Sequence, residues 1–297
     1  MALTRNGITF VDRESGELRA EQVYGERELR FLYETRWGPA LLRTLIKREW
    51  FSHLTGLLKR SPISRRQIPS FIRRYGIDDT ESEFPAAAYH SLDAFFARKL
   101  NPEMRPVDRD PRHLVAPAEG RVLAFAEVPG GRLQVKGCTV GIDELVGDLD
   151  GFQPGACFVI RLAPCDYHRF HFPADGQASG PVRIGRGLHS VHPIALTAGA
   201  PSFRNKRMVT MLSGTTFGRL IQVEVGALTV GSVVQTYKRG PVKKGQEKGY
   251  FHFGGSTVIL LIEPGRVVPD EDLLDATARG LETLVKVGTR IGLATHD

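Results

Sequence analysis

The chain has 297 residues, of which 41% are hydrophobic and 25% are charged, and it carries a formal net charge of +7. This composition is that of an ordinary globular protein, and no uninterrupted apolar run is long enough to span a membrane. Its cysteines, Cys138, Cys157 and Cys165, lack paired CxxC spacing, which argues against a zinc site and a disulfide framework. The positive charge suits an anionic partner, such as nucleic acid, a phosphate-bearing small molecule or an anionic membrane, or a solvated basic surface without a partner.

The N-terminal part begins with a predicted strand or hairpin in residues 1–20, followed by a helical pattern from residue 26 to residue 59. Residues 1–13 lack the pattern of a signal peptide, so we expect a cytoplasmic protein. The helical stretch has an apolar face that includes Trp50 and Phe51 and is edged by lysine and arginine. Such a face fits a membrane interface, and it also fits packing on its own domain or on a second subunit, as most surface helices do.

Two shorter helices are predicted before the chain changes character. The first covers residues 65–75, with Ser64 as its N-cap and Gly76 at its end. The second covers residues 92–100 and is capped by a serine. A proline-containing connector follows, and we place the boundary of this helical region at about residue 110.

Beyond residue 110, short β-type runs alternate with glycine and proline turns, which predicts a mostly antiparallel core. The expected strands are residues 121–128, 156–162, 218–225, 231–237, 257–263 and 282–287, the last of which follows a helix at 271–278. The predicted fold class is therefore α+β, with a helical N-terminal region (1–110) followed by a β-rich core (111–297).

A dense polar cluster, Asp166-Tyr167-His168-Arg169-Phe170-His171-Phe172-Pro173, is the first candidate for chemistry. His168 and His171 would face opposite sides on a strand and the same side on a helical turn. A third ligand at metal-binding spacing is missing, so no metal site is expected. A histidine that acts as a base needs a nucleophile and an orienting carboxylate. Glu119, on a Pro/Gly turn before a strand, is either a solvated turn residue or that carboxylate.

The candidate nucleophile is Ser256, which follows Gly254-Gly255 and opens an apolar strand. Taken alone, this stretch is typical of a glycine bulge leading into a core strand. Together with His171 and Glu119, it makes a Glu–His–Ser set that is widely spread along the sequence.

With these residues in place, the sequence resembles the proenzymes of phosphatidylserine decarboxylase, in the branch whose cleavage motif reads Gly-Gly-Ser-Thr. The resemblance covers nearly the whole chain. The blocks that carry it are Phe253-Gly254-Gly255-Ser256-Thr257, the 166–173 cluster, Val135-Lys136-Gly137 with Leu145-Val146-Gly147, Val225-Gly226-Ala227 with Val230-Gly231-Ser232, Phe95-Phe96-Ala97-Arg98-Lys99-Leu100, Val23-Tyr24-Gly25 and Phe31-Leu32-Tyr33-Glu34-Thr35.

The resemblance implies a self-cleaving mechanism. The hydroxyl of Ser256, activated by His171 and its orienting carboxylate, attacks the carbonyl of Gly255, and β-elimination then divides the chain. The products are a β chain of residues 1–255 and an α chain beginning at residue 256, whose first residue becomes a pyruvoyl cofactor. Phosphatidylserine forms a Schiff base with this group and loses carbon dioxide to give phosphatidylethanolamine, and His168 is the candidate proton donor.

The resemblance also implies partners and a location. We expect phosphatidylserine as substrate, an anionic membrane surface as a contact, a homodimer of αβ units, and a peripheral position on the cytoplasmic face of the membrane. Nucleic acid is not expected, because the β core lacks an aromatic-rich basic strand motif.

One position departs from the family pattern, since Glu119 stands where aspartate is usual. The additional methylene moves the carboxylate, and steps that depend on orientation are sensitive to such shifts. The alternatives are a poorly processed or non-catalytic relative that binds anionic lipid, and a pyruvoyl decarboxylase of a soluble amino acid.

Overall fold

The computed structural model describes residues 8–21, 56–135, 138–147, 151–185, 205–226, 233–254 and 256–295. Most of the predicted helix at 26–59, including Trp50 and Phe51, lies outside these ranges, and so does Gly255. Within them, no helix is long and apolar enough to cross a bilayer.

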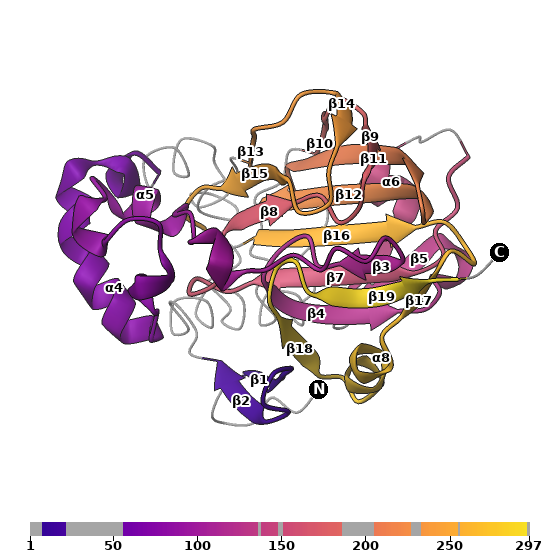
Figure 1. Cartoon of the computed structure of the whole chain (residues 1–297), viewed down its shortest axis with the longest axis horizontal. Helices are drawn as coiled ribbons and strands as arrows, with labels where there is room; N and C mark the ends of the chain where they lie inside the picture. The colour runs from indigo at the N-terminus through magenta and orange to yellow at the C-terminus, as the bar shows by residue number, and fades with distance from the viewer. Residues whose placement is uncertain are drawn as a thin grey trace, which may run out of the picture.

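The described part of the chain is built on an eleven-stranded sheet (Figure 1). Its strands in spatial order are β14 (Gly240–Val242), β9 (Gly176–Ala178), β11 (Arg207–Thr215), β12 (Gly218–Gly226), β16 (Ser256–Ile262), β7 (Cys157–Leu162), β4 (Gly120–Phe125), β18 (Glu282–Val285), β1 (Ile8–Asp12) and β2 (Leu18–Glu21), with β10 (Val182–Ile184) paired to β11. Neighbouring strands are antiparallel except β1 and β18, which run parallel. The prediction of a mostly antiparallel core in an α+β fold is confirmed.

Both faces of this sheet are covered, so β16 is buried along its whole length. Successive side chains on a strand point to opposite faces. Val258, Leu260 and Ile262 therefore pack on one face, against two small sheets. These sheets consist of β13 (Val233–Gln235), β15 (Glu247–Phe251) and β8 (Arg169–His171), and of β17 (Val267–Pro269), β19 (Arg290–Ala294) and β3 (His113–Val115). Ile259 and Leu261 pack on the other face. There they meet β5 (Arg132–Val135), β6 (Cys138–Gly141) and α6 (Ile142–Val146).

Residues 56–104, which we call the helical lobe, lie at the end of the sheet where β16 begins (Figure 1). The lobe contains a helical segment at 56–60, α4 (Ile68–Tyr75), α5 (Leu92–Phe96) and the short 3-10 helices Pro62–Gln67, Asp79–Glu81, Ala86–Ala88 and Pro102–Met104. Gly76 ends α4 in a left-handed conformation at φ 60°, as predicted. A serine, Ser91, caps α5, which is shorter than the predicted 92–100.

The predicted N-cap at Ser64 is wrong. Ser61 caps the preceding 3-10 helix instead, because Pro62 begins that helix three residues earlier. The hydroxyl of Ser64 accepts a hydrogen bond from the backbone N–H of Leu92 at 2.9 Å, which joins the two ends of the lobe.

The N-terminal hairpin of β1 and β2 is part of the main sheet, held by a buried ion-pair network. Arg161 on β7 pairs with Glu21 at 2.6 Å and with Glu282 at 2.7 Å. All three side chains are less than a tenth exposed. The network ties the first strands of the chain to the strand that lies beside β16.

The C-terminal end agrees with the prediction except for one additional strand. The helix α8 covers Glu271–Ala278, as predicted. The strand predicted at 282–287 is β18, but it is not the last one, since β19 follows after a turn at Val287 and Gly288.

Candidate functional site

Ser256 is the first residue of β16 and lies between two strands. Its backbone pairs with Gly226 on β12 and with Leu162 on β7. The alternation along the strand places its side chain on the same face as Val258. Ser256 is fully buried, and its Oγ has no hydrogen-bond partner among the described residues. A buried hydroxyl without a partner is costly, so this one calls for a functional explanation.

His171 ends β8 and presents a free basic nitrogen. Its Nδ1 lies 3.0 Å from the carbonyl oxygen of Gly245. A carbonyl only accepts hydrogen bonds, so the proton of the neutral ring is on Nδ1 and Nε2 carries the lone pair. Within the described residues, Nε2 is buried without a partner. Burial lowers the pKa of His171 below its ordinary value of 6.5, which keeps the ring neutral at pH 7.

His168 has the same tautomer in a more apolar setting. Its Nδ1 donates to the carbonyl oxygen of Asp166 at 2.9 Å, and its Nε2 is buried with no partner in the described part of the chain. The ring of Phe96 lies over it, with 3.7 Å between centroids. Burial lowers the pKa of His168 to about 3. As it stands, His168 is a proton acceptor, and it must first take up a proton before it can deliver one.

Glu119 lies beside β8 but is bound to an arginine. Its carboxylate accepts from Arg105 Nε at 2.5 Å, and Arg105 also pairs with Glu81 at 2.7 Å. An isolated antiparallel bridge joins Ala118 to Phe170, and both side chains are in the core. Since side chains alternate along a strand, Glu119 and His171 point to the other side. Burial raises the pKa of Glu119. In this antiparallel pairing His171 stands opposite Pro117, to whose carbonyl its backbone N–H donates at 2.7 Å, and Glu119 stands opposite Arg169. No hydrogen bond joins Glu119 to His171, whose Nδ1 is bonded to Gly245.

The segment that leads to Ser256 is held by Asp93, a residue that the sequence did not single out. The Nδ1–H of His252 donates to Asp93 Oδ2, and the backbone N–H of Phe253 donates to Asp93 Oδ1, both at 2.7 Å. Although burial opposes the shift, these hydrogen bonds lower the pKa of Asp93. The ring of Phe253 packs on Phe96 with 4.9 Å between centroids. The helical lobe therefore fixes the chain immediately before the candidate cleavage site.

A buried ion pair shares the face of the sheet on which Ser256 lies. Lys248 Nζ binds Glu224 at 2.7 Å, and both side chains are fully buried. Glu224 is two residues from Gly226 on β12, so its side chain is on the Ser256 face. Burial raises the pKa of Glu224 and lowers that of Lys248. Sequence analysis missed this pair because Lys248 lies in the polar-looking stretch 243–248.

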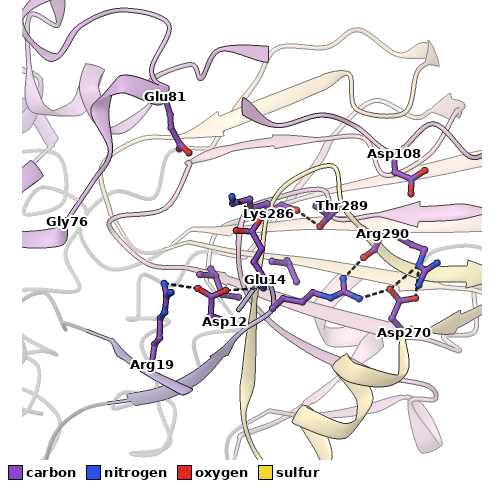
Figure 2. A pocket seen from close by; sticks show the side chains of 13 residues that line it. Asp12, Glu14, Arg19, Gly76, Glu81, Asp108, Asp270, Lys286, Thr289 and Arg290 are labelled. Atoms are coloured by element: carbon purple, nitrogen blue, oxygen red, sulfur yellow. Dashed lines mark hydrogen bonds and ion pairs between the residues drawn. The ribbon is translucent and has the colours of Figure 1, made fainter. Parts of the chain in front are cut away.

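A cavity of about 650 Å³ lies elsewhere, between the β1–β2 hairpin and the C-terminal strands (Figure 2). Its cations are paired with neighbouring carboxylates. Arg19 pairs with Asp12 (Figure 2), and Arg13 pairs with Asp270. None of Ser256, His168 and His171 lines it, so this cavity is separate from the candidate reaction centre. No group of three histidine, cysteine or acidic residues that could hold a metal occurs in the described ranges.

Comparisons with known proteins point to one family. A family model described as phosphatidylserine decarboxylase matches residues 92–293. The chain is 40% identical over 291 residues to the phosphatidylserine decarboxylase proenzyme of Chlamydia trachomatis serovar D, covering 96% of this chain and 97% of that protein. It is 38% identical to the proenzyme of Clostridium perfringens strain SM101 (96% and 99% covered) and 37% identical to that of Fusobacterium nucleatum (96% and 97%).

Proposed function

We propose, from the premise that the chain belongs to the phosphatidylserine decarboxylase family, that it decarboxylates phosphatidylserine to phosphatidylethanolamine after cutting itself between Gly255 and Ser256. The observation that carries the proposal is the set of buried polar atoms without a partner among the described residues. They include Ser256 Oγ, His171 Nε2 and His168 Nε2. A nucleophile and two neutral bases are what the reaction requires.

In the self-cleavage step, His171 Nε2 accepts the proton of Ser256 Oγ. The oxygen attacks the carbonyl carbon of Gly255, the peptide nitrogen leaves, and an ester joins the two residues. Removal of the Ser256 α-proton then breaks the ester bond by β-elimination, giving chains 1–255 and 256–297. Asp93 supports this step by fixing His252 and Phe253, so that the scissile bond is presented in one position.

Glu119 is proposed as the carboxylate that stabilises the positive charge that develops on His171. To reach Nδ1 of His171, Glu119 must release Arg105 and replace the carbonyl of Gly245, because both of these hydrogen bonds are made in this structure. The carbonyl of Gly245 orients the ring in the meantime.

The buried, unpartnered Oγ of Ser256 fits a residue that is converted in place to the pyruvoyl cofactor. When formed, this group supplies the electron sink for loss of carbon dioxide. His168 is proposed to take up a proton when the substrate amine binds and to return it to the α-carbon. The ring of Phe96 shields His168 from water, which keeps that proton in the site.

We also propose that the helical lobe contacts an anionic membrane from the cytoplasmic face. Leu57, Leu58 and Ile63 are more than half exposed, and Arg65 and Arg66 beside them are exposed as well. Exposed apolar and basic side chains together are typical of a peripheral bilayer contact. Co-sedimentation with phosphatidylserine vesicles tests it. A homodimer of αβ units remains a prediction of the resemblance and is tested by sedimentation equilibrium.

The decisive experiment is the intact mass of the purified protein, with denaturing electrophoresis and a carbonyl reagent. We expect two chains, cut before Ser256, and a carbonyl group on the shorter one. The Ser256→Ala variant should remain uncut, and His168→Gln should be cut but release little carbon dioxide. A single uncut chain of full mass refutes the proposal. Activity on free serine but not on the lipid would show that the substrate is a soluble amino acid.

A further inference from the structure

Arg98, which follows α5 in the helical lobe, has a buried guanidinium group that is only partly satisfied. The residue is 4% exposed. Its Nη2 donates to the carbonyl oxygen of Cys165 at 3.3 Å. Its Nε and Nη1 have no hydrogen-bond partner among the described residues. A buried cation with vacant donors is unfavourable unless a ligand completes it, so the two N–H groups indicate a binding site.

The position of Arg98 connects it with the proposed reaction centre. Cys165 belongs to the turn that also supplies the carbonyl partner of His168. Burial is the main cause that lowers the pKa of His168, and the charge of Arg98 contributes to the same shift. The guanidinium carbon lies 4.9 Å from the ring centroid of Phe95, which is a cation–π contact. Arg98 and His168 therefore share one buried neighbourhood.

The nearest carboxylates do not bind the vacant N–H groups of Arg98. Glu119 and Asp166 both act on the charge of Arg98. However, Glu119 is bound to Arg105, and Asp166 is bound to Arg121. Arg98 therefore keeps vacant N–H groups that can donate to the oxygens of an anion.

We propose that Arg98 binds the phosphodiester of the phosphatidylserine headgroup through a vacant N–H group, an inference that rests on the proposed function. The headgroup also carries a carboxylate, but that group loses its charge in the reaction. An arginine on the carboxylate would bind the ground state better than the transition state and would slow the step. The phosphodiester keeps its charge throughout the reaction. Only a methylene and an oxygen separate its phosphorus from the α-carbon, to which His168 is proposed to return a proton.

The test uses the self-cleaved enzyme and dihexanoyl phosphatidylserine below its micelle concentration, so that membrane binding does not contribute. We expect Arg98→Gln to be cut at Gly255–Ser256 like the wild type and to raise KM about 10- to 100-fold, the usual effect of losing a charge-assisted hydrogen bond. The matched control, Arg112→Gln, removes an exposed arginine and should leave KM unchanged. If Arg98→Gln does not fold, Arg98→Lys, which keeps the charge but lacks the guanidinium N–H groups, carries the test.

Two inhibitors separate the phosphate from the carboxylate. Phosphoethanolamine has only the phosphate, and L-serine has only the carboxylate. We expect Arg98→Gln to raise the inhibition constant of phosphoethanolamine and to leave that of L-serine unchanged. An unchanged constant for phosphoethanolamine overturns the assignment. A wild-type protein that is not cut, or that releases no carbon dioxide, refutes the proposed function instead.

Discussion

Replacing Asp93 by alanine should slow self-cleavage although the side chain is not part of the reacting group. The carboxylate receives two hydrogen bonds of 2.7 Å, from His252 and from the backbone of Phe253, and Asp93 is only 6% exposed. A hydrogen bond to a charged group contributes about 1.5–3 kcal/mol, and part of that is regained as chain entropy when the segment is released. If the loss of positioning raises the activation free energy of self-cleavage by about 2–4 kcal/mol, the rate falls by about 30- to 1,000-fold.

The assay follows the conversion of newly synthesised chain to its two fragments by denaturing electrophoresis. Asp93→Asn keeps one acceptor oxygen and should fall between the alanine variant and the wild type. Glu103→Ala removes an exposed carboxylate from the same lobe and should be cut at the normal rate. Thermal unfolding of the uncut chains checks that the lobe is intact. If Asp93→Ala folds and is cut at the wild-type rate, the segment is positioned by Phe253 packing alone and the reasoning is refuted.

Three further predictions concern charge. The cleavage rate should be level from pH 8 to pH 6.5 and fall only below, because burial lowers the pKa of His171 below 6.5 and the base works in its neutral form; a fall that begins above pH 6.5 contradicts this. Glu119→Gln should slow cleavage about tenfold or more, since it removes the charge proposed to stabilise protonated His171; an unchanged rate in the gel assay leaves Gly245 as the only orienting group. Arg161 holds the pKa of Glu21 at about 2 against burial, which opposes the shift. The pairing of Glu21 with Arg161 stabilises the fold fully above pH 4.5, and this stabilisation is lost as the pH falls from 4.5 to 2. In denaturant unfolding, the free energy of unfolding of the wild type should therefore fall by about 3 kcal/mol over this range, and Glu21→Gln should lack that fall.

The long elements of the fold could be predicted from the sequence because their side-chain patterns are strong. The run after Ser256 is apolar and β-branched, and β16 ends within one residue of the prediction. The helix α8 agrees at both ends. Three-residue strands such as β8 and β3 carry too few side chains for a pattern, and their pairing is decided by contacts with distant segments.

In the candidate site, only the residues that lie in local sequence motifs could be predicted. Ser256, His168 and His171 stand in recognisable local sequences, and the structure gives each a buried, unpartnered atom. The contact of Asp93 with His252 spans 159 residues, and no local pattern announces it. Likewise, Arg105 rather than a histidine binds Glu119, a choice made by tertiary packing. The signal that identifies Arg98 is an unfilled donor, which only coordinates reveal.

The position of β16 in the sheet determines how the protein unfolds and refolds after a cut before Ser256. The 42 residues from 256 to 297 supply this central strand together with β18, so a cut before Ser256 leaves two polypeptides interlaced through one sheet. Neither piece can leave without exposing the core, and the mature enzyme should survive dilution. After full denaturation, however, the pieces must find each other again, and recovery becomes a second-order process that depends on concentration. With the proposed cut, the uncut precursor refolds as one chain, whereas refolding of the cut form depends on its concentration.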